Sequence, residues 1–308
     1  MKTDHFIDVD ASAEAAFRVC VEVERWPEIF PPCIDAVVLE ETMRSQRVRL
    51  TARANDRIFT WESVRSIDRA NCRVTFSQVR PAPLVKSMQG VWEFTPKGAN
   101  GCRITLSHEF ELHDDVSGRV EGVATSADAE RFMRSTLHAN STRELEAIVT
   151  WLRRQAWRHE FSESVVMNAS SRAIYDLLRD AENWPSLLPH CLAVDMRYED
   201  PWNQEFTMTV KVDGNVEEIR SIRRLFGDSI EYFQPEPPPA LTEHQGHWRL
   251  RDTGAGIEVT SSHAVVLNPS FFSAHCATEA KQIVERAINR NSLGTMQAIL
   301  NKLGAHRE

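Results

Sequence analysis

The chain contains one long motif twice. The pattern Gln-x2-Pro-x-Pro-x5-Gln-Gly-x-Trp occupies residues 78–92 and recurs without a gap at 234–248, in a chain of 308 residues. The offset of 156 residues (234 − 78) marks two copies of one domain, because solenoid repeats have periods of roughly 20–50 residues. The fold must therefore be one that about half of this chain can form.

Shorter matches in the same order support the duplication. Trp26-Pro27 returns as Trp184-Pro185 at offset 158, and Val64-Arg65-Ser66-Ile67 returns as Ile219-Arg220-Ser221-Ile222 at offset 155. The second match aligns Arg65 with Arg220. No flexible linker separates the copies, so we expect two domains at residues 1–156 and 157–308.

Composition bounds the class of protein. The chain is 42% hydrophobic and 26% charged, which is typical of a soluble globular protein. Its net charge of −8 argues against nucleic-acid binding, and no apolar run is long enough to cross a membrane. Six scattered cysteines without CxxC spacing favour reduced thiols over disulfides or a zinc site, so we expect a cytoplasmic protein without a metal.

The periodicity of one copy predicts a strand, a short helical region, six strands and a long helix. The first strand covers 5–10, and Ser12 is expected to cap a helix that runs to about Arg25, where Trp26-Pro27 breaks it. Period-two alternation predicts strands at 34–41, 47–54, 58–67, 73–79, 87–95 and 103–112, and a helical pattern covers 127–155.

The second copy repeats this order, with its long helix at 274–303. The layout predicts an α+β fold of two tandem helix-grip domains. In each, a curved antiparallel sheet of about seven strands surrounds the long C-terminal helix and leaves an internal cavity.

Strand alternation also predicts which side chains face each cavity. Polar residues share these inward faces with apolar ones in both copies, and burying unpaired polar groups twice would be costly without a use for them. The first copy places Phe59, Trp61, Arg65, Phe76, Gln78, Met88, Trp92 and His108 inward, and the second places Arg220, Tyr232, Gln234, Trp248 and His263 inward.

Each polar candidate also has a structural interpretation. Arg65 could be a surface residue at a strand end, His108 a hydrogen-bonded core histidine, and Gln78 a partner of backbone groups near the Pro-x-Pro loop. Trp92 and Trp248 fit a core as well as a pocket wall, and Gly90 fits a bulge or a close approach of two chains. The sequence contains no P-loop, HExxH or G-x-S-x-G motif.

The order of elements, the Trp-Pro turn and the Pro-x-Pro loop before Gln-Gly-x-Trp resemble the START-like (SRPBCC) polyketide cyclase superfamily. Two such domains in one chain resemble the di-domain aromatase/cyclases of bacterial type II polyketide biosynthesis. The resemblance implies that a poly-β-keto chain on an acyl carrier protein is folded, closed to its first ring and dehydrated, without metal or organic cofactor. It also implies contact with a ketosynthase or ketoreductase, in a monomer or homodimer.

The resemblance gives the candidate residues their roles. Arg65 and Gln78 would donate hydrogen bonds to enolate or alkoxide oxygen, and His108 would be the acid/base. The expected substrate contacts are Trp26, Phe59, Trp61, Phe76, Met88, Trp92, Arg220, Tyr232, Gln234, Trp248 and His263. All three tyrosines lie in the second copy, so the first copy, taken as the main site, offers no tyrosine acid/base. The alternative is a non-catalytic carrier of a lipid, quinone or polyketide.

Overall fold

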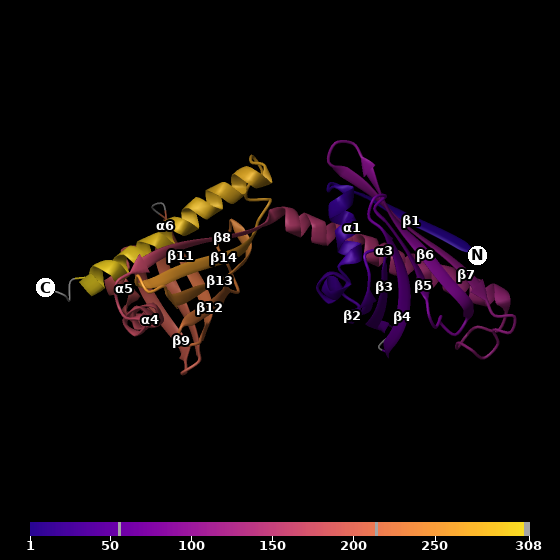
Figure 1. The fold of residues 1–308 in the computed structure, drawn as a ribbon, viewed down its shortest axis with the longest axis horizontal. Helices are drawn as coiled ribbons and strands as arrows, with labels where there is room; N and C mark the ends of the chain where they lie inside the picture. Colours follow the sequence, from indigo (N-terminus) through magenta and orange to yellow (C-terminus); the bar gives the residue numbers. More distant parts are fainter. Residues whose placement is uncertain (55–56, 213–214, 305–308) are drawn as a thin grey trace. The chain divides into compact units, whose positions relative to one another are not determined.

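The computed structural model describes residues 1–54, 57–212 and 215–304, and the chain divides into two compact units, Met1–Arg153 and Arg154–Glu308. In each unit one long helix is gripped by a curved sheet (Figure 1). No helix of the described ranges is long and apolar enough to cross a membrane. The two tandem helix-grip domains expected from the sequence are confirmed, and the internal cavity stays a prediction.

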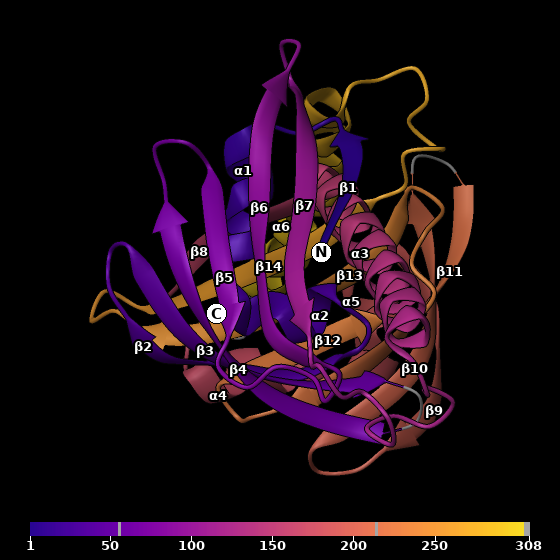
Figure 2. The ribbon, with the colours of Figure 1, turned by 90° about the vertical axis from the view of Figure 1, so that its right-hand side faces the viewer.

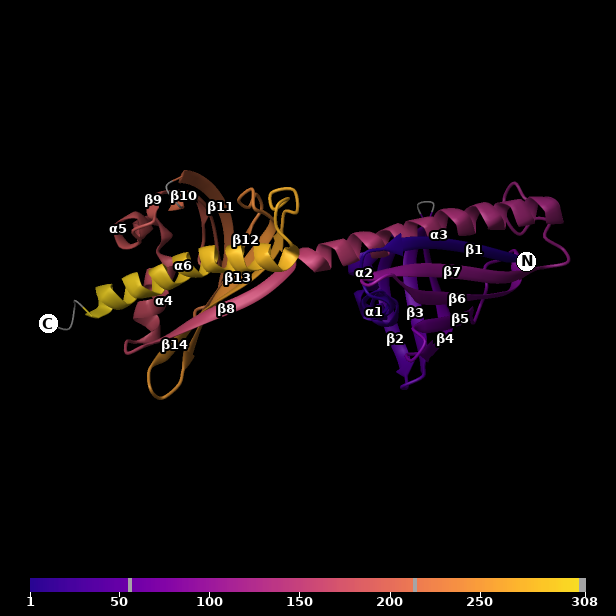
Figure 3. The same ribbon diagram turned by 90° about the horizontal axis from the view of Figure 1, so that it is seen from above.

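The first unit has one sheet of seven antiparallel strands in the order β1-β7-β6-β5-β4-β3-β2. The first strand β1 pairs with the last strand β7, so β1 and β2 form the two edges of the sheet. The long helix α3 runs beside β1 (Figures 2 and 3). The elements are β1 Lys2–Val9, α1 Ala13–Val21, η1 Val23–Arg25, α2 Trp26–Ile29, β2 Cys33–Glu41, β3 Ser45–Ala54, β4 Arg57–Asp68, β5 Arg73–Gln78, β6 Val85–Lys97, β7 Gly101–Leu112 and α3 Ser126–Trp157.

The second unit repeats this topology, with strand order β8-β14-β13-β12-β11-β10-β9. The elements are β8 Arg158–Met167, α4 Ser171–Arg179, η2 Ala181–Asn183, α5 Trp184–Leu187, β9 Cys191–Glu199, β10 Asn203–Val212, β11 Asn215–Leu225, β12 Ser229–Gln234, β13 Leu241–Asp252, β14 Ile257–Leu267 and α6 Ala277–Gly304. Each predicted strand lies within a few residues of an observed one.

The first helix of each unit begins as the sequence predicts but ends differently. The Ser12 hydroxyl accepts a hydrogen bond from the Ala15 N–H at 3.2 Å, as an N-cap does, and Ser170 caps α4 in the same way. The prediction that the helix runs to Arg25 and is broken by Trp26-Pro27 is wrong. Helix α1 ends at Val21, and Trp26 and Pro27 begin the short helix α2, because proline fits the first turn of a helix.

The register of strands β3 and β4 shows how the two domains correspond. Gln46 pairs with Arg65 in the first sheet, and Gln204 pairs with Arg223 in the second, both at offset 158. The ion pair on the outer face of the same two strands has its charges exchanged between the domains. In the first domain Arg47 binds Glu62 at 2.7 Å, and in the second Glu205 binds Arg220 at 2.9 Å. Arg65 therefore corresponds to Arg223, and Arg220 occupies the position of Glu62.

Each interior holds a polar layer between two apolar clusters. On β7, Leu106 belongs to the cluster around α1 and Phe110 to the cluster around the loop before α3, with His108 between them. On α3, Leu145 and Leu137 belong to the same two clusters, with Ser141 between them. We define the polar layer of the first domain as Thr3, His5, His108 and Ser141.

Candidate functional site

A close approach of two strands builds the floor of the polar layer. Gly90 pairs with His108 on one side and with Phe76 on the other. A Cβ atom at Gly90 would lie 2.6 Å from the Ser107 carbonyl oxygen and 2.7 Å from Phe76 Cε1. Only glycine lets the Phe76 ring lie across this strand, where it meets the His108 ring edge-on at 5.7 Å. This explains the glycine of the repeated motif and confirms the predicted close approach.

The polar layer of the first domain contains buried atoms that lack partners. Thr3 Oγ1, His5 Nδ1, His108 Nδ1 and Ser141 Oγ have no hydrogen-bond partner within the described part of the chain. They come from β1, β7 and α3, and Thr3 stands directly opposite His108 in the sheet. Buried polar atoms in native proteins are nearly always hydrogen-bonded, so this cluster is suited to binding the oxygens of a ligand.

Burial sets the protonation of His108. The side chain faces inward as predicted and the residue is only 9% exposed. Burial, and to a smaller extent the charge of His5, lower the pKa of His108 to about 4. The imidazole is therefore neutral near pH 7 and can accept a proton.

Helix α3 brings a carboxyl group that the sequence patterns did not single out. Burial raises the pKa of Glu144 to about 7, against a smaller opposing effect of Arg143. Glu144 lies one helical turn from Ser141 and from Ile148, both buried, and its charge helps raise the pKa values of Cys20 and Cys33. The second domain has Thr295 at this position, whose hydroxyl donates to the Asn291 carbonyl oxygen.

Arg65 lies inside, as predicted, and holds the end of helix α1. The residue is 2% exposed, and its guanidinium donates to the Cys20 carbonyl oxygen at 2.6 Å and to Gln46 Oε1 at 2.8 Å. It also stacks over the Trp26 ring at 5.2 Å. Burial lowers the pKa of Arg65, an effect that Cys20 partly opposes. No carboxylate among the described residues forms an ion pair with this buried cation.

The same anchor recurs in the second domain, at a residue that the sequence alignment missed. Arg223 donates to the Leu178 carbonyl oxygen at 2.6 Å and stacks over Trp184 at 5.1 Å. The expectation that Arg220 faces the second interior is wrong. Arg220 lies on the outer face, where it pairs with Glu205 and Glu236, because the matching letters of Val64–Ile67 and Ile219–Ile222 are three positions out of structural register.

The two histidines in the polar layer of the second domain are hydrogen-bonded within the protein. Tyr232, at the position of Phe76, places its hydroxyl 2.8 Å from His263 Nδ1, and His263 Nε2 lies 3.0 Å from the Ser292 hydroxyl. His244, at the position of Met88, donates from Nδ1 to Gln234 Oε1 at 2.8 Å and lies 3.2 Å from His263. Burial lowers the pKa of His244 to about 3 and raises that of Tyr232.

The remaining candidates divide between interior, core and rim. Gln78 is half-buried at the end of β5, at the position of Gln234. Trp92 and Met88 are core residues of the two apolar clusters, and Trp248 packs at the edge of a core cluster. Trp26 and Trp61 pack beside β2 and β3, whereas Phe59 is 50% exposed.

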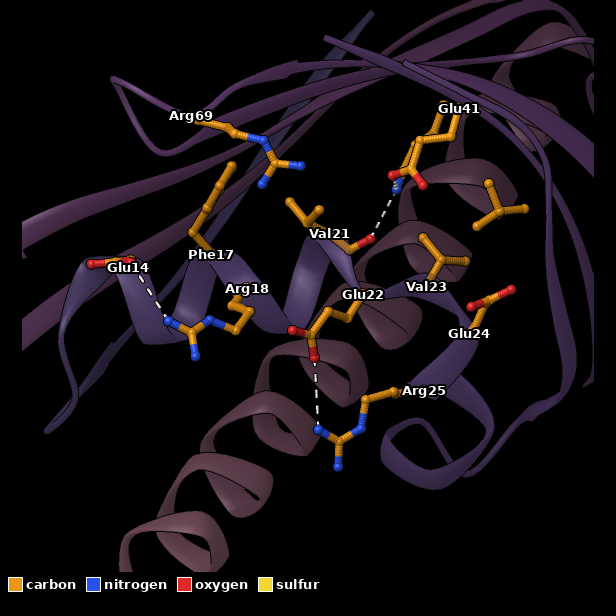
Figure 4. Close-up of a pocket in the computed structure, with 12 residues that line it drawn as sticks. Glu14, Phe17, Arg18, Val21, Glu22, Val23, Glu24, Arg25, Glu41 and Arg69 are labelled. Atoms are coloured by element: carbon orange, nitrogen blue, oxygen red, sulfur yellow. Dashed lines mark hydrogen bonds and ion pairs between the residues drawn. The ribbon is translucent and has the colours of Figure 1, made fainter. Parts of the chain in front are cut away.

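Two hollows open on the surface of the first domain. One, of about 600 Å³, lies beside the end of α1 and includes Gln46, the partner of Arg65 (Figure 4). Charged side chains surround it, with ion pairs between Glu14 and Arg18 and between Glu22 and Arg25. The other, of about 470 Å³, lies on the outer face of the sheet behind Arg65, Phe76 and His108.

Comparison with known proteins gives consistent matches over the chain. The family model described as "Polyketide cyclase / dehydrase and lipid transport" matches residues 9–133 and again 167–292. The granaticin polyketide synthase bifunctional cyclase/dehydratase of Streptomyces violaceoruber is 28% identical over 308 residues, covering 96% of this chain and 92% of the relative. The actinorhodin polyketide synthase bifunctional cyclase/dehydratase of Streptomyces coelicolor is 32% identical over 282 residues, covering 86% and 84%.

A solved structure gives the same match in three dimensions. The match to the di-domain ARO/CYC BexL from the BE-7585A biosynthetic pathway covers 98% of this chain and 98% of the BexL chain. The sequence identity is 28% and the TM-score is 0.50.

Proposed function

Because the chain belongs to the polyketide cyclase / dehydrase and lipid transport family, we propose that its first domain closes and dehydrates the first ring of a polyketide. The chain is a polyketide cyclase of two START-like domains. The proposed substrate is a poly-β-keto chain held as a thioester on an acyl carrier protein, and the proposed location is the cytoplasm.

The contrast between the two polar layers carries the assignment to the first domain. Four buried polar atoms there lack partners within the described residues, whereas the histidines of the second domain bind Tyr232, Gln234 and Ser292. A poly-β-keto chain has a carbonyl oxygen on every second carbon and could satisfy such atoms. The second interior also holds buried atoms without a partner among the described residues, on Glu163 and Asn289 for example, but its central histidine is already bound by Tyr232 and Ser292 and is less free to act as a base.

Ring closure needs a base, a folded chain and stabilisation of negative oxygen. In the proposed mechanism neutral His108 removes a proton from a CH2 group between two carbonyls. The resulting enolate carbon attacks a ketone carbon of the same chain, and the new alkoxide takes the proton back from the His108 imidazolium to become a hydroxyl. Holding both carbons in contact supplies much of the acceleration, and the apolar clusters on either side of the layer would hold the chain.

Loss of water needs an acid, and Glu144 is suited to that role. With a pKa of about 7, a large fraction of this carboxyl is protonated near neutral pH, and it can donate a proton to the departing hydroxyl. His108 removes the neighbouring C–H proton, the carbon–oxygen bond breaks, and water leaves as the ring gains a double bond. The separated pKa values of Glu144 and His108 favour this division into acid and base.

Arg65 would supply charge rather than protons. Its guanidinium has no anionic partner among the described residues, so a developing enolate or alkoxide would be the first negative group to approach it. Gln78 remains the proposed second donor at the end of β5. The proposed wall residues are Trp26, Phe59, Trp61, Phe76, Met88 and Trp92.

The test compares buried acid/base groups of the two domains. A minimal ketosynthase and acyl carrier protein would supply the chain, and liquid chromatography with mass spectrometry would quantify the products. We expect Glu144→Gln and His108→Gln each to reduce the dehydrated, ring-closed product by ~100-fold or more, the usual contribution of general acid–base catalysis. Glu144→Gln should also accumulate ring-closed product that retains its hydroxyl.

The matched controls lie in the second domain. Thr295→Ser, at the position of Glu144, and Tyr232→Phe, which installs the residue of the first domain, should leave the product profile unchanged. A profile that survives both first-domain substitutions but changes with Tyr232→Phe would move the active site to the second domain. A profile unchanged in all four variants would favour a carrier over a catalyst.

A further inference from the structure

A line of three histidines connects the first interior to the surface. His108 is buried on β7, His5 is half-buried on β1, and His138 is exposed on α3. The rings of His5 and His138 lie with their centroids 5.3 Å apart. Because Thr3 stands opposite His108 and His5 is two residues further along the same face, His5 is the diagonal neighbour of His108.

Electrostatic effects link the same three residues in order. The pKa of His108 is lowered by burial and then by His5, and the pKa of His5 is lowered by burial and then by His138. The charge of Asp4, the neighbour of His5 in the sequence, raises the pKa of His5 by a smaller amount. From α3, the nearby charge is that of Arg134, which donates to the Lys2 carbonyl oxygen. Nδ1 of both His5 and His108 is buried and lacks a partner within the described ranges.

The second domain keeps the central histidine but not the line. His263 corresponds to His108, yet Glu163 stands in the place of His5 and Asn289 in the place of His138. The Glu163 carboxylate lies 3.8 Å from His263 Nε2. The histidine line therefore belongs to the domain that we propose to be catalytic, and the shared fold does not require it.

The proposed chemistry creates a need for such a line, and the inference rests on that proposed function. In each dehydration His108 gains a proton from carbon while Glu144 loses one to the departing hydroxyl. Before the next turnover the imidazolium must lose its proton and the Glu144 carboxylate must regain one from solvent. The proton on a buried histidine leaves readily only when a group within hydrogen-bond reach accepts it, directly or through one water.

We propose that His5 and His138 carry the proton taken up by His108 from the interior to solvent, and so restore His108 as a base after each turnover. His5 would accept the proton from His108 and pass it to His138, which is exposed and exchanges it with buffer. His138 is exposed and does not touch the substrate, whereas His5 belongs to the polar layer and passes the proton between His108 and His138.

The experiment separates the first turnover from later ones. The probe is a synthetic pantetheine thioester that carries a ring-closed β-hydroxy ketone, and its aromatisation is followed by absorbance. The variants are His5→Gln and His138→Asn, the latter importing the residue of the second domain. The control is His275→Gln, an exposed histidine of the second domain.

We expect His138→Asn, which lies outside the polar layer, to keep the wild-type rate with enzyme in excess, because one proton can be stored on His108. With substrate in excess the turnover of both variants should fall ~10-fold or more, and KM should fall with it because the slowed step follows the chemistry. Added imidazole should restore turnover, as for a lost general acid–base group. His275→Gln should match wild type in both regimes. Thermal unfolding of each variant verifies that the fold is intact.

Two results would overturn the relay. One is unchanged multiple turnover in His5→Gln, and the other is equal loss of single and multiple turnover without rescue by imidazole, which indicates a structural role. His108→Gln tests the underlying function separately, since it should abolish even the first turnover. If His108→Gln retains that turnover, the proposed function fails before the relay is in question.

Discussion

In the second domain the Tyr232 hydroxyl lies 2.8 Å from His263 Nδ1, whereas in the first domain the equivalent Phe76 meets His108 only with the edge of its ring. The tyrosine hydroxyl is thus the difference between His263, which has a hydrogen-bond partner at Nδ1, and His108, whose Nδ1 lacks a partner within the described residues. The duplication kept the frame of the interior and changed its hydrogen bonding.

The Tyr232 hydroxyl should contribute to stability more than to catalysis. We expect Tyr232→Phe to lower the free energy of unfolding by about 1–3 kcal/mol, because it leaves His263 Nδ1 with one fewer buried partner. Urea denaturation measures the loss. A larger effect on product formation than on stability would contradict this expectation.

The glycines of the repeated motif should not tolerate a methyl group. We expect Gly90→Ala and Gly246→Ala each to destabilise the protein by about 1–3 kcal/mol, since the added Cβ overlaps Phe76 or the Tyr232 hydroxyl and a strand carbonyl oxygen. Gly294→Ala is the matched control. It lies on α6 with nothing within 4 Å of the added atom, and alanine should stabilise the helix by about 0.5–1 kcal/mol. Thermal denaturation orders the three variants.

The two arginines of β11 should behave in opposite ways. Arg223→Met removes the buried anchor of α4 and should cost about 2–4 kcal/mol, because it frees a buried carbonyl oxygen and leaves a smaller side chain under Trp184. Arg220→Ala breaks a partly exposed ion pair and should cost about 0–1 kcal/mol. Equal losses in a urea titration would contradict the structural register that equates Arg65 with Arg223.

Acid should destabilise the second domain through His244. Its pKa is about 3 in the folded protein and near the ordinary 6.5 when unfolded, so between these values the unfolded chain binds a proton that the folded chain does not. Stability from this residue is complete above pH 6.5 and falls as the pH drops, by up to ~1.4 kcal/mol per unit. His244→Met, which copies Met88, should flatten the dependence between pH 6.5 and 4. An unchanged slope would show that other groups determine acid unfolding.

The fold could be predicted because the strands alternate regularly and the copies support each other. The inward positions of His108, Gln78 and Tyr232 followed from period-two alternation and agree with the structure. The inward prediction for Arg220 is wrong because it rests on three identical residues in a stretch of four and takes no account of the cross-strand partners. The offset of 158 residues between Trp26 and Trp184 also relates Gln46 to Gln204. Applied to Arg65, this offset identifies Arg223 as the corresponding inward arginine.

Two groups of the candidate site could not be found from the sequence. Glu144 sits on a helix among exposed charged residues, and only the packed structure shows that protein surrounds its carboxyl and raises its pKa. His5 lies near the start of a strand whose neighbours were unknown. Its importance depends on the pairing of β1 with β7, which brings together residues about a hundred positions apart.

The reversed pair Arg47–Glu62 and Glu205–Arg220 limits how the two domains can be recombined. A chimera that takes β4 of the first domain from β11 of the second would place Arg220 diagonally across from Arg47, two like charges on the outer face of neighbouring strands. The reciprocal exchange would place Glu62 diagonally across from Glu205. The hairpin β3–β4, rather than the single strand, is thus the smallest module that an engineer could graft between the halves without charge repulsion.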